Sequence, residues 1–337
     1  MFFVLSGFLI TSLLLSENES NGRIDLKKFF GRRALRLAPA LLVYLSFIAV
    51  TQGWSVTWPS LFYVGNYAQI AGGDVGLNVH TWSLAVEEHF YLVWPLLFVF
   101  LSASRPKQRL VLVASATVFL LGWRFAVPDA MWAYQGTDTN AYALALGCLV
   151  ALGRVSWTPS VRLAKLCLVG IVALGFYPVA SVEEFLGTGR WVAPVAATLG
   201  GIAVWASATY TQDWLASRLP VQAGRISYAL YLWHPAVLFL FLSRISADPT
   251  LVSLGAIAVS IGLAILSWWC VEAPVLRSRW AARMSVQRSP VRSNPEVPAE
   301  ALRGLHATGK RRISGIPADQ EEIVTESLHR PVDRVGG

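Results

Sequence analysis

The sequence has little charge: Lys, Arg, Asp and Glu make up 14% of its 337 residues, against roughly 25% in a soluble globular domain. Hydrophobic residues make up 55%, and the mean hydropathy is +0.51. A water-soluble fold cannot expose that much apolar surface, so we expect lipid as the surrounding solvent. The basic residues, which give a net charge of +8, cluster between apolar runs and in the last stretch. This pattern is typical of membrane proteins and predicts membrane lipids, not nucleic acid, as partners.

Cysteine is also scarce, and all three cysteines (Cys148, Cys167 and Cys270) lie inside apolar runs. Their number is odd and their spacing fits no metal motif, so we expect buried free thiols and no metal site. The sequence lacks a Walker loop, a Rossmann fingerprint, an HExxH motif and a CxxC pair, and Ser83 has no GxSxG context. The common soluble nucleotide, zinc and serine-hydrolase sites are therefore not expected.

Nine apolar runs approach the length of a bilayer-crossing helix, which takes roughly 20 residues. They cover about 1–15, 37–53, 82–102, 109–127, 141–153, 163–180, 191–209, 226–243 and 250–271. Basic residues concentrate in alternate connections, whereas 54–80 and 128–140 contain none. By the positive-inside rule the basic connections are cytoplasmic. We predict an all-α, polytopic integral membrane helix bundle of about nine spans, with Met1 outside and the chain after Val275 inside.

The two ends of the chain carry separate expectations. The run 1–15 would span only about 22 Å of a hydrocarbon layer roughly 30 Å thick, and it lacks the features of a signal peptide. We therefore expect at least one helix before Met1. From about Leu276 the composition turns polar and rich in Pro, Ser, Arg and Glu, which predicts a disordered, basic cytoplasmic tail over 276–337. The preceding residues, 1–275, form the predicted membrane domain.

The most polar stretch at an apolar run is HTWSLAVEEHFYLVWP, residues 80–95. At helical spacing one face carries His80, Ser83 (or Leu84), Glu87, Tyr91 and Trp94. Glu87, Glu88 and His89 then lie one or two turns inside the span, where ionisable groups are costly and usually face a cavity. A carboxylate beside an imidazole suits acid–base chemistry. The alternative is an interfacial aromatic belt whose charges reach back to water.

The second stretch, FFGRRALRLAP at 29–39, carries an arginine cluster (Arg32, Arg33 and Arg36) on the predicted cytoplasmic side. Guanidinium groups one turn apart can hold phosphates through paired hydrogen bonds, as a phosphate-bearing cofactor would need. The alternative is ordinary positive-inside anchoring of the neighbouring helix.

The third stretch is GRISYALYLWHP at 224–235, whose helix would place Ser227, Tyr231 and His234 on one face. His234 precedes a proline, whose missing N–H opens the backbone ladder there. A packed core histidine is the alternative, although Arg225 and Tyr228 add polar companions. Two shorter signals are Glu272-Ala-Pro274, which alone indicates a helix end, and Ser6-Gly7, which would let two helices approach closely.

These stretches, with FFVLSGFLIT at 2–11 before them, occur in an order that resembles the acyltransferase-3 family of membrane O-acyltransferases. The similarity covers about residues 1–275. It implies a bundle of about ten helices in the cell (inner or plasma) membrane, and an acyl-CoA co-substrate, acetyl-CoA above all, bound from the cytoplasm. It also implies a carbohydrate or glycolipid hydroxyl as acceptor, in lipopolysaccharide, peptidoglycan, exopolysaccharide or a small glycoside. No permanently bound cofactor is implied.

The resemblance also suggests roles for individual residues. The family's essential histidine lies on a first helix that we expect before Met1, so it is open whether this chain alone is active. Glu87 would orient that histidine, and the arginine cluster would hold the donor's phosphates. The remaining candidates are His80 and His234 for catalysis, and Trp82, Ser83, Tyr91 and Tyr228 for substrate binding.

Two positions depart from the family pattern. The family usually shows an Arg and an Asp before the helix predicted at 141–153, where this chain has Asn140 and Tyr142. His89 stands where glutamine is common. The first departure puts that part of the site in doubt, whereas the second could adjust the site or be neutral.

Two other function classes fit part of the pattern. Intramembrane Glu and His also suit the proton relay of a transporter or flippase for a small molecule or a lipid-linked sugar, although the sequence shows no internal repeat of the kind such proteins use. A non-catalytic remnant is the other alternative. Consumption of acyl-CoA would separate an enzyme from both.

Overall fold

The computed structural model describes residues 1–153, 160–176, 181–209, 217–246, 248–278 and 280. The chain divides into two compact units, Met1–Ser285 and Val286–Gly337, and every described residue belongs to the first unit. Most of the predicted tail therefore lies outside the described residues.

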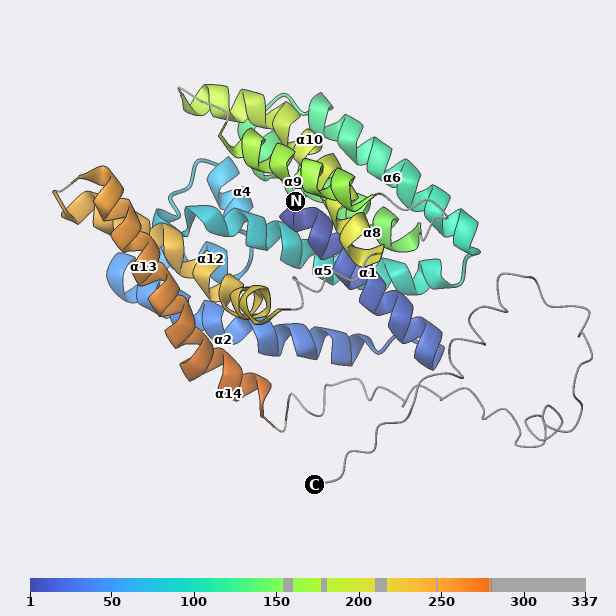
Figure 1. The fold of residues 1–337 in the computed structure, drawn as a ribbon, viewed down its shortest axis with the longest axis horizontal. Helices are drawn as coiled ribbons and strands as arrows, with labels where there is room; N and C mark the ends of the chain where they lie inside the picture. Colours follow the sequence, from blue (N-terminus) through green and yellow to red (C-terminus); the bar gives the residue numbers. More distant parts are fainter. Residues whose placement is uncertain (154–159, 177–180, 210–216, 247, 279, 281–337) are drawn as a thin grey trace, which may run out of the picture. The chain divides into compact units, whose positions relative to one another are not determined.

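The described part of the chain is helical and contains no β-strand, which confirms the all-α prediction (Figure 1). The longer helices are α1 (Phe2–Asn21), α2 (Leu26–Gln52), α5 (Trp82–Ser102), α6 (Pro106–Ala126), α8 (Thr137–Leu152), α9 (Val161–Gly175), α10 (Val182–Thr209), α12 (Arg218–Arg244) and α13 (Pro249–Ser267). The shorter ones are α3 (Trp54–Leu61), α4 (Gly65–Ile70), the 3₁₀-helix η1 (Gly76–Thr81), α7 (Ala130–Gln135), the π-helix η2 (Trp268–Glu272) and α14 (Ala273–Leu276).

Seven helical segments of the described residues are long and apolar enough to cross a membrane. The predicted runs 141–153 and 163–180 correspond to α8 and α9, which have 16 and 15 residues and reach only about 24 Å and 22 Å. The chain is thus a multi-pass membrane protein, and the count of nine crossings stays a prediction.

Two helices begin or end outside the predicted runs. Helix α1 continues through polar residues to Asn21, so its 20 residues reach about 30 Å and extend nearly two turns beyond the predicted end. Helix α2 begins eleven positions before the predicted run 37–53, because Asp25 caps it: the Asp25 carboxylate accepts a hydrogen bond of 3.0 Å from the Lys28 backbone N–H. The arginine cluster therefore lies on the first turns of a helix and not in a loop.

Helices α1 and α8 cross in direct backbone contact. A Cβ atom on Gly7 would overlap the carbonyl oxygen of Leu144, and one on Gly147 would overlap that of Val4. Small residues at such a crossing let helices gain close van der Waals contact where lipid offers no hydrophobic drive. The prediction of close approach at Ser6-Gly7 is confirmed.

Buried apolar side chains form three clusters that hold the long helices together. One joins α2, α5 and α12 around Tyr44, Ile48 and Leu232. A second joins α1, α5, α6 and α8 and includes Leu14 and Phe98. The third lies between α1, α8 and α10. Helix α5 contributes to the first two clusters, so the polar residues on its buried face lie between them.

One expectation for the end of the membrane domain is wrong. Cys270 is exposed, whereas Cys148 and Cys167 are buried as expected. Glu272-Ala-Pro274 lies at the end of the helical run, which continues from α13 through η2 to Leu276. The wider π-turn accommodates the proline, which lacks an N–H. It also turns Glu272 inward, where its carboxylate accepts a 3.2 Å hydrogen bond from the Ser267 hydroxyl.

Candidate functional site

The buried face of α5 is the centre of the polar region. Leu84, Glu87, Tyr91 and Trp94 are all buried, at the three- and four-residue spacing of one helix face. This part of the predicted face is confirmed, whereas His80 lies in η1, before α5 begins. The Glu87 carboxylate, 4% exposed, accepts a hydrogen bond from the Ser6 hydroxyl of α1. Glu87 is therefore fixed by a donor from a helix distant in sequence.

Arg33, Glu88 and Tyr91 form a group between α2 and α5. The Arg33 guanidinium carbon lies 3.1 Å from the centre of the Tyr91 ring, and Arg33 Nη2 lies 3.7 Å from Glu88 Oε1. Arg33 Nε and Glu88 Oε1 are buried without a hydrogen-bond partner, as is the Tyr228 hydroxyl of α12. Buried polar groups are normally satisfied, so we call Arg33, Glu87, Glu88, Tyr91 and Tyr228 the arginine–glutamate group and regard it as the candidate binding centre.

Tyr63, which sequence reasoning missed, belongs to the same surroundings. It lies between α3 and α4 with a φ of 56°, a left-handed conformation that is rare for a bulky residue and is often held in place at a functional site. Burial raises the pKa of its hydroxyl to about 12, with the Glu88 carboxylate acting in the same direction and Arg33 opposing. No motif in the sequence marks this position.

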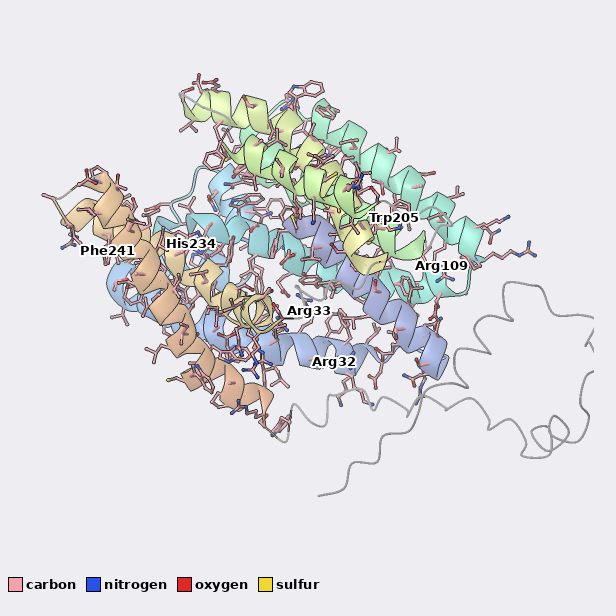
Figure 2. All side chains as sticks on the ribbon, viewed as in Figure 1. Arg32, Arg33, Arg109, Trp205, His234 and Phe241 are labelled. Carbon is pink, nitrogen blue, oxygen red and sulfur yellow. The ribbon has the colours of Figure 1, made fainter. Side chains whose placement is uncertain are left out.

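The arginine cluster does not form a single clamp. Arg32 pairs with Glu17 at the end of α1, with Nη2 and Oε2 3.2 Å apart, and the other Glu17 oxygen accepts the Asp25 backbone N–H. Arg33 lies against α5, and Figure 2 labels both arginines along α2. Arg36 is exposed and interacts electrostatically with Glu272. Successive positions of a helix point in different directions, so only Arg33 and Arg36 remain positioned for a ligand.

A second polar group, here called the histidine group, consists of His80, Ser83, Tyr231 and His234. The Tyr231 hydroxyl donates to the His80 carbonyl oxygen at 2.5 Å and lies 2.7 Å from the Ser83 hydroxyl. The His80 and His234 rings are 6.2 Å apart, and both ring nitrogens of His80 are buried, with backbone groups of Leu77 and Leu232 as their polar neighbours. The sequence predicted these four residues, and the fold brings them together from η1, α5 and α12.

His234 presents a defined nitrogen to its surroundings. Its Nδ1 lies 3.0 Å from the carbonyl oxygens of Leu230 and Tyr231. A carbonyl can only accept, so Nδ1 carries the proton and Nε2 is the basic nitrogen of the neutral ring. The side chain borders an open cavity of about 410 Å³ between α12 and α13, and Figure 2 labels His234 on α12. Ser227 and Tyr231 share this wall, as predicted for one helix face.

The predicted substrate-binding residues fall into separate places. The Trp82 ring packs 4.8 Å from Tyr134 of α7 and 6.1 Å from Phe3 of α1. Ser83 belongs to the histidine group, whereas Tyr91 and Tyr228 belong to the arginine–glutamate group. These four residues therefore do not line a single substrate-binding pocket.

Arg124 is a second residue that sequence reasoning missed. It is 1% exposed and donates to the backbone carbonyls of Ala133, Thr139 and Gly189 at 2.5, 3.3 and 3.0 Å. It also lies 3.4 Å from the Asn140 side-chain oxygen. Asn140, one of the departures from the family pattern, thus serves a network that joins α6, α7, α8 and α10. Among the described residues, no group of three or more His, Cys, Asp or Glu could hold a metal ion.

Together, the apolar helix bundle and its buried ionisable groups define a polytopic membrane protein with a polar centre. The family model described as "Acyltransferase domain" matches residues 1–269, and the chain belongs to this family of acyltransferases. The resemblance inferred from its motifs is confirmed.

Curated proteins provide further comparisons. The chain is 30% identical over 317 residues to "O-acetyltransferase OatA" of Staphylococcus aureus (strain NCTC 8325 / PS 47), covering 83% of this chain and 52% of that protein. It is 31% identical over 320 residues to "Peptidoglycan O-acetyltransferase OatA" of Listeria monocytogenes, covering 82% and 51%. The chain spans about half the length of these curated relatives. No solved structure matches the chain.

Proposed function

We propose that this chain is the membrane domain of an O-acetyltransferase that moves an acetyl group from acetyl-CoA to a hydroxyl of a cell-wall carbohydrate. The observation that carries the proposal is the arginine–glutamate group: buried, ionisable and partly unpartnered side chains inside a membrane bundle of an acyltransferase family. Such groups are retained in membranes where they serve a ligand or a reaction. The names of the relatives support acetyl as the acyl group and peptidoglycan as the acceptor.

The reaction sets the chemical requirements. The acceptor oxygen attacks the thioester carbonyl, a C–O bond forms, the C–S bond breaks, and the hydroxyl proton leaves with the coenzyme A thiol or a base. A weak hydroxyl nucleophile needs a general base, and the carbonyl oxygen needs donors as negative charge develops on it. Arg33 can supply such donors, because its Nε has no hydrogen-bond partner and its guanidinium is always charged.

The two polar groups divide the work between donor and acceptor. Arg36, exposed on α2, would hold a coenzyme phosphate on the predicted cytoplasmic side, and Arg33, which faces Tyr91 and Glu88 of α5, would lie toward the thioester. Arg32 would fix the corner between α1 and α2 through Glu17. The histidine group lies at the opposite end of α2 and would receive the acceptor. There His234 Nε2 and the buried His80 ring are the candidate bases.

Turnover of radiolabelled acetyl-CoA in membranes tests the proposal. The chain is compared with a version extended into the upstream reading frame, each with and without Glu87→Gln, and with soluble peptidoglycan fragments as acceptor. We expect labelled ester on the fragments and its loss in the Glu87→Gln variant. Neither turnover nor acetyl-CoA binding in either version would overturn the proposal and favour a transporter or a non-catalytic protein.

A further inference from the structure

Asp138, at the start of α8, is held between two tryptophan side chains from other helices. Trp123 Nε1, at the end of α6, donates to Asp138 Oδ2 at 2.6 Å. Trp132 Nε1, in α7, donates to Asp138 Oδ1 at 3.0 Å. A Cβ atom on Gly136 would lie only 2.6 Å from the Trp132 ring and 2.7 Å from Asp138 Oδ1. The close approach of indole and carboxylate therefore requires glycine at that position.

These side chains are accessible, and a line of rings connects them to the candidate site. Trp123 is 43% exposed, and Trp132 and Tyr67 are each 38% exposed. The Tyr67 ring lies 6.3 Å from Trp132 and stacks 5.9 Å from His89. His89 directly follows Glu88, and its Nδ1 lies 2.8 Å from the hydroxyl of Thr137, the residue before Asp138. The line thus runs from an open surface to the helix that carries the arginine–glutamate group.

We propose that Trp123, Trp132, Tyr67 and Asp138, the aromatic–carboxylate platform, bind a sugar ring of the acceptor glycan. A pyranose offers a face of C–H groups, which suits an exposed aromatic ring, and a rim of hydroxyls, which donate to a carboxylate. The platform offers both surfaces in a fixed arrangement. This proposal rests on the proposed function, because it assigns the place where the carbohydrate acceptor of the acetyl transfer binds.

The hydrogen bonds distinguish this platform from an ordinary interfacial aromatic belt. Belt tryptophans direct their N–H groups to water or lipid headgroups. Here both N–H groups point to one carboxylate, so the indoles position Asp138. Neutral N–H donors leave the carboxylate its full charge, so sugar hydroxyls and a cationic headgroup could both contact Asp138. The peptidoglycan-modifying relative favours a sugar ring as the occupant.

Binding of a soluble probe tests the platform independently of catalysis. The probe is the disaccharide of N-acetylglucosamine and N-acetylmuramic acid, measured by saturation-transfer NMR on the purified full chain in detergent. We expect Asp138→Asn and Trp132→Leu to weaken binding about tenfold, as for loss of a hydrogen bond to a charged group. Trp54→Leu is the matched control, because Trp54 is a tryptophan on α3 that is even more exposed (58%). Thermal melting identifies any variant that fails to fold, and Trp123→Phe, which removes only the N–H-bearing ring, then provides a second variant.

The outcomes separate the two proposals. Loss of disaccharide binding in the platform variants, with the Trp54 variant unchanged, supports the platform even if acetyl transfer is absent and the proposed function fails. Acetyl transfer with an unchanged acceptor KM in folded Asp138→Asn overturns the platform and leaves the proposed function standing. Binding of phosphocholine in place of the disaccharide, abolished by the same variants, also overturns it and identifies a lipid headgroup site.

Discussion

The guanidinium of Arg33 lies over the ring of Tyr91, with 3.1 Å between the guanidinium carbon and the ring centre. This contact joins α2 and α5 beside the carboxylates of Glu87 and Glu88. It holds a permanent positive charge beside Glu88 while a face of the guanidinium is covered by an aromatic ring. Arg33 is consequently a fixed, largely buried cation on a helix that is long and apolar enough to cross a membrane, and such a charge is costly to keep there unless it serves a ligand or a partner.

Arg33→Lys is expected to lower acetyl transfer by about tenfold or more, because an ammonium keeps the charge but loses the planar face and its contact with Tyr91, worth roughly 1–2 kcal/mol when desolvated. The measurement is transfer of radiolabelled acetyl groups to peptidoglycan fragments. Arg23→Lys, at an exposed position between α1 and α2, is the matched control. Equal transfer by wild type and Arg33→Lys would show that the guanidinium geometry has no role.

Glu87→Gln is expected to reduce the rate of acetyl transfer about 100-fold if Glu87 takes part in proton transfer, while the melting temperature changes little, since the amide oxygen can still accept from Ser6. Ser6→Ala should instead lower the melting temperature and change the rate of acetyl transfer little. It leaves a buried carboxylate oxygen without its donor, which costs about 1–3 kcal/mol of stability. Parallel losses of rate and melting temperature in both variants would indicate a purely structural Glu87.

Much of the fold follows from local pattern. The buried face of α5 was predictable because Glu87, Tyr91 and Trp94 recur at the helical period, and the close crossing at Gly7 because small residues are required where backbones touch. The helix boundaries were harder to predict from the sequence. The start of α2 depends on the Asp25 cap. The end of α1 includes the polar residue Glu17, which pairs with Arg32 of α2.

The site was predictable only in part, because its geometry depends on tertiary contacts. The members of the histidine group were recognisable in two separate motifs, one on α12 and one around the start of α5, but the sequence did not predict that these motifs meet. The division of the arginine cluster depends on Glu17 and Glu88, which lie on other helices. Tyr63 and Arg124 had no sequence signal, because a single tyrosine in a connection and a single arginine at a helix end are ordinary features.

Gly147→Ala is expected to destabilise the protein by about 1–3 kcal/mol or more, as overpacking does, because its Cβ would overlap the Val4 carbonyl oxygen and force α1 away from α8. Thermal unfolding in detergent, followed with a thiol-reactive dye, measures the change; the buried Cys148 and Cys167 report opening of the bundle. Gly122→Ala is the matched control, because a Cβ there meets no atom within 4 Å. A melting temperature lowered equally by both variants would contradict the close contact.

Arg124→Gln is expected to destabilise the junction of α6, α7, α8 and α10, because it removes the guanidinium from a set of buried carbonyl acceptors. Each acceptor left unpaired costs about 1–3 kcal/mol, with relaxation reducing the total. The charge-preserving Arg124→Lys should recover only part of the loss, since an ammonium cannot reach acceptors spread across several elements as a guanidinium does. Thermal melting measures both, with Lys107→Gln on an exposed surface of α6 as control. If Arg124→Lys matched wild type, the positive charge alone would hold the junction, and the directional hydrogen bonds would have no separate role.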